Sequence, residues 1–375
     1  MIRIPRLWAI ARKEALQIRR DPRSLGMAFV IPMVLLFLFG YALTLDVNNL
    51  KTIVYDQDGS SRSRDFLARF QESRYFTVVA VAERLADMDA ALDAGWAQVG
   101  LVLPRNFARD LDLGRTVPVQ ALLDGADSNT ATIAMSYLEA IGSRYSAGLR
   151  MERSGLGPRD PAIEARVRVW YNPELLSKNF IIPGLIAVIM MVIAALLTSL
   201  TIAREWERGT MEQLIATPLR VPELILGKLL PYFGIGVLDV VLAVLGGVLV
   251  FGVPLRGSVV LLLALSMVFL LGALSLGMLI SIKTKSQLLA SQVAMVVTFL
   301  PSFLLSGFMY DIGNMPVWLQ AITHLFPARY FVTILKAIFL KGVGLRLLWP
   351  EALFLTLFAV LVTVDANRKF RKSLD

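Results

Sequence analysis

The sequence has no cysteine and a single histidine, His324. The lack of cysteine excludes disulfide frameworks and thiolate metal or redox centres, and one histidine cannot by itself build a histidine-based metal site. Charged residues are also scarce, at 18% of the 375 residues, whereas hydrophobic residues make up 56%. This composition is too apolar for an ordinary soluble protein, and the apolar residues come in blocks that are typical of membrane spans.

Recognisable catalytic motifs are lacking as well. The chain contains no G-x-x-x-x-G-K-[ST] loop for nucleotide phosphates, no G-x-S-x-G turn and no H-E-x-x-H helix. We therefore predict no catalytic residue, no metal site and no cofactor on this chain, so that it is not an enzyme. No nucleic-acid-binding motif explains the net charge of +9. That charge lies mostly beside the apolar runs, because residues 46–178 alone sum to −2, with 16 basic and 18 acidic side chains.

Six apolar runs are long enough to cross a bilayer, whose hydrocarbon core is about 30 Å thick. The predicted spans are residues 25–45, 180–203, 225–251, 258–282, 288–308 and 349–364. The first is longer than the apolar part of a signal peptide, and no A-x-A cleavage site follows it, so we predict a retained helix. The basic flank at residues 1–24 places the N-terminus in the cytoplasm, and six spans return the basic tail, residues 367–375, to the same side. We therefore predict an α-helical polytopic membrane protein with both termini cytoplasmic.

Two segments beside the spans are also apolar. Residues 1–24 have the pattern of an amphipathic helix that lies on the membrane surface. Its apolar residues are Leu7, Trp8, Ile10, Ala11, Ala15 and Ile18. Residues 309–348 are too apolar for a plain loop, and a re-entrant or interfacial helical hairpin from Val317 to Leu340 explains this. The alternative is two further spans, which would give eight helices with both termini still inside.

Residues 46–178, between the first and second spans, have the pattern of a folded domain that topology places outside the cell membrane. The expected strands are residues 51–55, 76–81, 99–103, 117–123 and 166–171, and the expected helices are residues 62–71, 83–94, 106–113 and 128–150. Strands that alternate with helices predict an α/β sheet with substantial parallel pairing. Asp56 and Asp58 end the first strand, and with Gly59 and Ser60 we interpret them as turn residues rather than metal ligands.

A charged stretch separates the second and third spans, from residue 204 to residue 228. Gly209 fits the left-handed position after a helix, and Thr210 is expected to cap a new helix with Gln213 completing a capping box. Pro218 ends that helix because the residue before a proline leaves the α region, and Pro222 suits the first turn of the next. The local pattern fits either a stiff surface for a partner or an ordinary wet loop.

Asp239 is an acidic residue near the middle of a predicted span. A charge at that depth costs at least about 2.5–3.5 kcal/mol, so Asp239 should face protein or water and have a partner. We interpret it as a hydrogen-bonded contact with a serine or threonine of a neighbouring span, with a polar point in a transport path as the alternative.

Three stretches carry a resemblance to a known family: residues 31–64, residues 205–218 with the sequence EWERGTMEQLIATP, and residues 304–342. With the span pattern, the chain resembles the permease subunits of ABC-2 type ABC transporters, in the bacterial multidrug-efflux-like branch. The resemblance implies an inner-membrane exporter of amphipathic compounds or drugs. It implies two partners: a cytoplasmic ABC ATPase that holds the ATP and Mg²⁺, and a second permease, identical or related. Membrane lipid and a periplasmic adaptor are further partners that we leave open.

The resemblance also assigns residues to roles. The ATPase-coupling residues are Glu205, Glu207, Gly209, Thr210, Glu212 and Pro218. The residues of the family's re-entrant hairpin are Ser306, Gly307, Met315, Pro316, Pro327 and Arg329. One departure lies at Tyr310 and Asp311, where the family often has an apolar residue followed by proline, so the entry turn of the hairpin is in doubt.

A second class of function stays open at this point. The chain could be a membrane-anchored sensor or envelope-assembly protein that acts through its external α/β domain. The cytoplasmic side offers only short loops and tails, whereas a signalling protein would carry an output domain there. A proton-driven carrier is disfavoured because ionisable residues within the spans are scarce and no internal repeat is evident.

Overall fold

The computed structural model describes residues 3–43, 49–126, 128–153, 170–172 and 176–370. The chain divides into two compact units, one of residues 1–44 and 168–375 and the other of residues 45–167. The first unit is helical and the second contains the sheet. The parts of the predicted last strand at residues 166–169 and of the predicted tail at residues 371–375 lie outside the described residues.

The helical unit begins with two short helices, α1 (Ile4–Arg19) and α2 (Pro22–Leu25), and continues through η1 (Gly26–Val30) into α3 (Ile31–Ala42). After the sheet unit come α8 (Ser177–Glu207), α9 (Thr210–Ala216), α10 (Val221–Leu245), η2 (Gly246–Val250), α11 (Val259–Thr284), α12 (Gln287–Leu304) and η3 (Ile312–Asn314). The unit ends with α13 (Val317–Thr323), α14 (Pro327–Lys336), η4 (Ala337–Lys341) and α15 (Leu345–Lys369).

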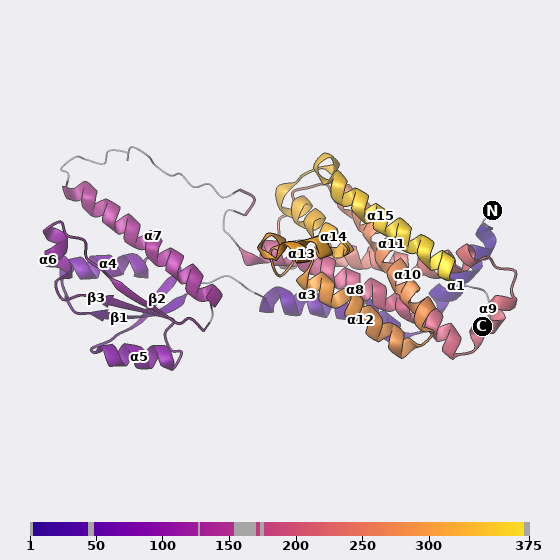
Figure 1. The fold of residues 1–375 in the computed structure, drawn as a ribbon, viewed down its shortest axis with the longest axis horizontal. Helices are drawn as coiled ribbons and strands as arrows, with labels where there is room; N and C mark the ends of the chain where they lie inside the picture. The colour runs from indigo at the N-terminus through magenta and orange to yellow at the C-terminus, as the bar shows by residue number, and fades with distance from the viewer. Residues whose placement is uncertain (1–2, 44–48, 127, 154–169, 173–175, 371–375) are drawn as a thin grey trace. The chain divides into compact units, whose positions relative to one another are not determined.

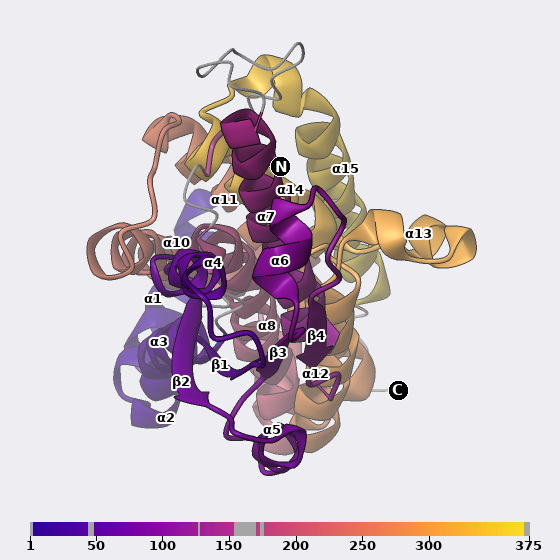
Figure 2. The ribbon, with the colours of Figure 1, turned by 90° about the vertical axis from the view of Figure 1, so that its left-hand side faces the viewer.

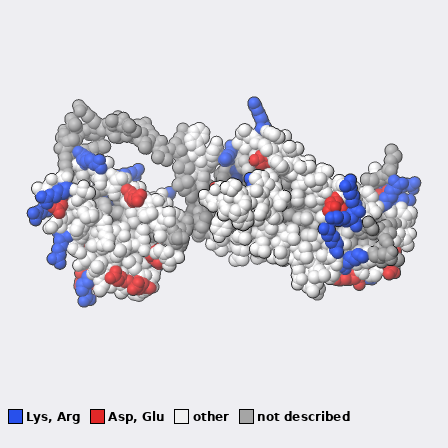
Figure 3. All heavy atoms as spheres, in the orientation of Figure 1, with Lys and Arg blue, Asp and Glu red and all other residues white. Residues whose placement is uncertain are grey.

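Within the described residues, five helices are long and apolar enough to cross a membrane: α8, α10 with η2, α11, α12 and α15. They correspond to the last five predicted spans. The most deeply buried of them is α8, which runs through the middle of the helical unit (Figure 1). On the face shown in Figure 3, the charged side chains of this unit gather towards its ends and leave a broad uncharged region between them, as expected of a membrane protein.

The first predicted span corresponds to a shorter apolar helix, Gly26–Ala42. It joins the π-helical η1 to α3, whose first turn holds Pro32. The ring of a proline has no N–H to donate, so the preceding turn widens where that bond is missing. The predicted end of this span, residues 44 and 45, lies outside the described residues.

Glycine allows α8 and α11 to approach closely. A Cβ atom added to Gly277 would lie 2.2 Å from the Ala195 carbonyl oxygen and from Thr198 Oγ1 of α8. At Gly272 a Cβ atom would lie 2.9 Å from the Phe358 ring of α15. The absence of a side chain at these two positions therefore permits close helix contact.

The segment between α12 and α15 folds into short helices. With 7 residues, α13 rises only about 10 Å, and α14 with η4 rises about 22 Å, at about 1.5 Å per residue. Neither reaches across a bilayer core of about 30 Å, so the alternative of two further spans was wrong. Most of α14 is buried against α8, α11 and α15, whereas α13 projects from the unit (Figure 2).

Within its described residues, the second unit is an α/β domain with four strands in the order β2-β1-β3-β4. The strands are β1 (Leu50–Asp56), β2 (Phe76–Val81), β3 (Val99–Leu103) and β4 (Gln120–Leu123). The helices are α4 (Ser61–Gln71), α5 (Leu85–Asp93), α6 (Phe107–Asp112) and α7 (Ser128–Arg153). The predicted parallel pairing is confirmed for β1 with β2 and with β3, whereas β4 runs antiparallel to β3.

Two apolar clusters hold this sheet between helices. Phe66, Phe70 and Phe107 bring α4 and α6 onto one face together with α7, and Met88 brings α5 onto the other (Figure 1). The aspartates after β1 form the predicted turn, because Asp56 Oδ1 accepts hydrogen bonds from the backbone N–H groups of Asp58 and Gly59 at 3.0 and 3.1 Å. Of the last predicted strand, the described residues 170 and 171 are not in a strand.

Candidate functional site

The charged turn between α8 and α10 contains a short, well-defined helix. Gly209 has a φ of 69°, the left-handed conformation that glycine adopts readily, and there α8 ends and α9 begins. The capping box predicted for Thr210 and Gln213 was wrong, because Gly209 occupies the N-cap position and Thr210 is already helical. The Thr210 hydroxyl instead donates a hydrogen bond back to the Glu205 carboxylate.

The two prolines act as predicted. Thr217, before Pro218, has a ψ of 155°, so α9 ends at Ala216. Pro222 lies in the first turn of α10, where its missing N–H leaves no helical bond unmade. The turn is thus stopped and restarted at fixed residues, which makes it a rigid element.

A buried ion cluster lies directly beneath this turn. The Lys228 ammonium of α10 contacts Glu14 Oε2 of α1 at 2.9 Å and Glu205 Oε1 of α8 at 3.1 Å. The side chains of Lys228, Glu14 and Glu205 are 1%, 3% and 6% exposed. Lys13 also contacts Glu205 at 2.8 Å, and the Tyr232 hydroxyl donates to Glu14 Oε1 at 3.2 Å. Two carboxylates and two ammonium groups therefore balance each other, and of these four side chains only Lys13, at 45% exposed, reaches water.

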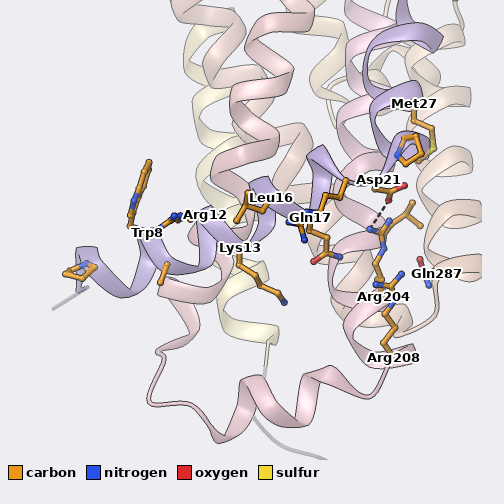
Figure 4. A pocket seen from close by; sticks show the side chains of 15 residues that line it. Trp8, Arg12, Lys13, Leu16, Gln17, Asp21, Met27, Arg204, Arg208 and Gln287 are labelled. Atoms are coloured by element: carbon orange, nitrogen blue, oxygen red, sulfur yellow. Dashed lines mark hydrogen bonds and ion pairs between the residues drawn. The ribbon is translucent and has the colours of Figure 1, made fainter.

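Further contacts join α1 to both sides of the turn. The Arg3 backbone N–H donates to Glu223 Oε1 at 2.8 Å, and Glu223 Oε2 also accepts from the Arg220 backbone N–H at 2.9 Å. At the other end, Arg204 pairs with Asp21 at 3.2 Å (Figure 4). As a result, α1 is fastened to the first turn of α10 and the last turn of α8.

These contacts change the prediction for the N-terminal segment. The amphipathic helix is present as α1, but Ile10, Ala11 and Ile18 are buried within the protein, with Ile10 and Ile18 in the core of the helical unit. Gly227 allows the approach of α1 to α10, since a Cβ atom there would lie 2.9 Å from Ile10. Trp8 and Ala15, in contrast, are exposed.

The predicted coupling residues divide into two groups. Glu205 and Thr210 lie together in the inner part of the turn and take part in the ion cluster. Gly209, Glu212 and Pro218 are exposed on its outer surface, and within the described residues no cation pairs with Glu212. Glu207 belongs to neither group, because its carboxylate accepts a hydrogen bond from the Gln287 backbone N–H at 2.7 Å and so holds the start of α12.

The sequence analysis missed Glu14, Lys228 and Tyr232. A signal for Lys228 was available, since it is a basic residue inside the apolar run that begins at residue 225. Lys228 and Tyr232 are four residues apart and so share one face of α10. Glu14 is an acid among the apolar residues of α1.

Asp239 is 1% exposed within α10. Its Oδ1 has no hydrogen-bond partner among the described residues. The expected bond to a serine or threonine of a neighbouring span is therefore not found there. The carboxyl group is buried without the polar contact that ordinarily compensates it.

The predicted hairpin residues bring α12, α13 and α14 together. Gly307 follows α12 with a φ of 76°, and Ser306 Oγ accepts from the Phe308 backbone N–H at 3.2 Å. Asp311 caps the next turn by accepting from the Gly313 N–H at 2.7 Å, which resolves the entry turn left in doubt by the departure at Tyr310 and Asp311.

The two hairpin helices each begin at a proline-marked position. Pro316 is the N-cap of α13, just after Met315, and Pro327 is the first residue of α14. Arg329 of α14 reaches back to the Gln320 carbonyl oxygen of α13 at 3.2 Å. The two helices therefore form a closed pair.

Lys336 holds α14 against its neighbours. Its ammonium donates to the Gly307 carbonyl oxygen at 2.8 Å and lies 3.4 Å from the centre of the Phe180 ring.

The bundle of long apolar helices defines a polytopic membrane protein, and the comparisons with known proteins identify its family. The profile of the ABC-2 family transporter proteins matches residues 22–364, so the chain belongs to that family. It is 40% identical over 371 residues to the probable multidrug ABC transporter permease YbhS of Escherichia coli, covering 99% of this chain and 98% of that protein. It is 32% identical over 369 residues to the probable multidrug ABC transporter permease YbhR of Escherichia coli, covering 98% of this chain and 99% of that protein.

A third relative, the inner membrane transport permease YhhJ of Escherichia coli, is 30% identical over 299 residues, covering 77% of this chain and 76% of that protein. The predicted family is confirmed, and the chain is a multi-pass membrane permease subunit of an ABC transporter.

Proposed function

We propose that this chain is half of an ATP-driven exporter that moves amphipathic compounds or drugs out of the cytoplasm or the inner leaflet. Two relatives are known as probable multidrug permeases, which supports this substrate class. ATP and Mg²⁺ belong to a separate ATPase subunit that docks on the exposed surface of α9. A second permease, identical or related, completes the path.

The observation that carries this proposal is the buried ion cluster beneath the turn. A push on α9 moves a transporter only if it reaches the long helices without being absorbed by a flexible loop. Lys228 links α10 to Glu205 at the end of α8 and to Glu14 of α1. A displaced α9 would therefore move α1, α8 and α10 as one body, because breaking a buried ion pair costs several kcal/mol, about 3–5 when one partner is lost.

A cytoplasmic position of α9 also determines the membrane topology of the chain. With α9 facing the ATPase in the cytoplasm, the six spans are Gly26–Ala42 and the five longer helices. The α/β unit then lies on the outer side of an inner membrane and is available to a periplasmic adaptor. The pair α13 and α14 enters the membrane again from that outer side.

The surface left for a second permease lies on the less buried spans. Only 22% of the most apolar part of α12 and 17% of that of α15 are covered within one chain. The remaining apolar surface suits lipid chains and the apolar helices of a second copy.

Co-purification tests the docking surface. The chain and its ATPase would be purified together in mild detergent, with docking and ATP hydrolysis measured for wild type and for Glu212→Arg. Exposed ion pairs are worth about 0–1 kcal/mol, and reversing the charge turns attraction into repulsion, so a change of about 1 kcal/mol should weaken docking roughly 5-fold. Glu72→Arg is the matched control, because Glu72 is also exposed but lies in the α/β unit.

Two results would count against the proposal. Docking that is equally strong in Glu212→Arg and wild type would place the ATPase elsewhere. A preparation without ATPase but with an envelope protein bound to the α/β unit would favour the sensor or assembly function instead.

A further inference from the structure

A strongly basic pocket of about 1190 Å³ lies between α1, the last turns of α8 and the start of α12. It adjoins the ion cluster but opens on the other side of α1. Its cationic residues are Arg12, Lys13, Arg20, Arg204 and Arg208. Figure 4 shows the labelled side chains spread along α1 and the end of α8.

Three of these cations have no counter-ion in the part of the chain that the structure describes. Lys13 pairs with Glu205, and Arg204 pairs with Asp21. The side chains of Arg12, Arg20 and Arg208 are exposed, and no described carboxylate lies within ion-pair distance of them. Three unpaired guanidinium groups around one cavity form a site for an anion with several oxygen atoms, and phosphate is the anion that such groups recognise best.

The apolar part of the pocket indicates what carries the phosphate. Met27, in the first residues of the apolar helix Gly26–Ala42, and Leu200 of α8 line the pocket together with Gln287, the first residue of α12. The pocket therefore lies where three apolar helices begin or end, at the level of lipid headgroups. Trp8, which is 62% exposed, also lines it, and tryptophan is enriched at this level of a membrane.

We propose that this pocket binds an anionic phospholipid, with the anionic headgroup facing the row of Arg12, Arg20 and Arg208 and the acyl chains lying along the apolar side. An acidic loop of a protein partner would match the cations equally well, but it would leave the apolar side of the pocket, which lies at membrane depth, unmatched. The proposal requires only that the chain spans a membrane, so it does not depend on where the ATPase docks.

The test measures lipid retained by the purified full chain in mild detergent, by native mass spectrometry after adding phosphatidylglycerol or phosphatidylcholine. Wild type should retain phosphatidylglycerol in preference to phosphatidylcholine. Each basic residue near a membrane surface contributes about 1 kcal/mol, so Arg12→Gln with Arg20→Gln should reduce retention roughly 30-fold. Each single variant should reduce it about 5-fold, and Arg12→Lys with Arg20→Lys should retain most of it.

The matched control is Arg3→Gln with Arg19→Gln. Both arginines are exposed beside or at the end of α1, and neither lines the pocket. The control removes the same charge from the same region, so a general electrostatic field would give both double variants the same loss. If the pocket binds the lipid, the control should lose clearly less retention than the pocket variant.

Three outcomes would overturn the proposal. Equal losses in the two double variants would assign the binding to diffuse attraction. Displacement of phosphatidylglycerol by inorganic phosphate alone would make this a site for the free anion. Unchanged lipid retention, with loss of ATPase co-purification in Arg12→Gln with Arg20→Gln, would assign the pocket to a protein partner.

Discussion

Replacing Lys228 by methionine tests whether the ion cluster stabilises the protein. Lys228→Met keeps the length and apolar stem of the side chain and removes its charge. Glu205 would keep Lys13 at 2.8 Å, but Glu14 would keep only the Tyr232 hydroxyl at 3.2 Å. Leaving a buried carboxylate without its cation costs about 3–5 kcal/mol, which reduces the folding equilibrium constant by roughly 100-fold or more.

A second variant separates charge from packing. Lys228→Met with Glu14→Gln removes both the cation and the carboxylate that it leaves unpaired. The loss in the free energy of unfolding should therefore be smaller in the double variant, by about 2 kcal/mol, than the sum of the losses in the two single variants. Residues in one network are coupled by roughly this amount. Denaturant unfolding of the detergent-solubilised full chain, followed by tryptophan fluorescence, measures all three.

The control uses the same substitution at an exposed pair. Lys369 contacts Asp365 at 3.0 Å, but the two side chains are 47% and 40% exposed. Water screens that pair, so Lys369→Met should change stability little. If Lys228→Met and Lys369→Met unfolded at the same denaturant concentration, or if the double variant showed additive losses, the cluster would not be the rigid connection argued above.

Two other predictions concern the helical unit. Asp239→Leu should raise thermal stability, because a carboxyl group without a described partner costs at least about 2.5–3.5 kcal/mol at membrane depth; a fall in stability would reveal a partner. Gly277→Ala should lower the free energy of unfolding by about 1–3 kcal/mol through overpacking. Gly234→Ala should not lower it in this way, because no atom lies within 4 Å of the added Cβ. Equal effects of the two substitutions would mean that α8 and α11 are not in contact at Gly277.

Local chemistry predicted the elements of this protein well. Gly209, Pro218 and Pro222 each impose a backbone conformation that does not depend on distant contacts, so the ends of the helices around the turn could be read from the sequence. The same holds for the order of strands and helices up to β4. The predicted capping box was wrong because Gly209 itself serves as the N-cap. Where two adjacent residues can both take the N-cap position, tertiary structure decides between them.

The contacts between distant segments could not be predicted in this way. Glu14 and Lys228 are 214 residues apart, and nothing in the local pattern of either specifies the other. Glu207 had the residue type expected of a docking contact, yet it caps α12 through Gln287. A carboxylate in a charged loop has several candidate donors, and only the packing of the helices selects one of them.

The two faces of α1 nevertheless held a readable signal. Ile10, Glu14 and Ile18 are spaced by four residues, so they share one face of the helix, and that face is buried. Arg12, Leu16 and Arg20 share the opposite face, which is exposed and alternates between basic and apolar as a membrane interface requires. An acid in the middle of an apolar face is stable only if a cation from another element meets it. The apolar runs of this chain contain one lysine in such a position, at residue 228, so the pair follows once α1 is recognised as a helix with one face directed at protein and the other at lipid.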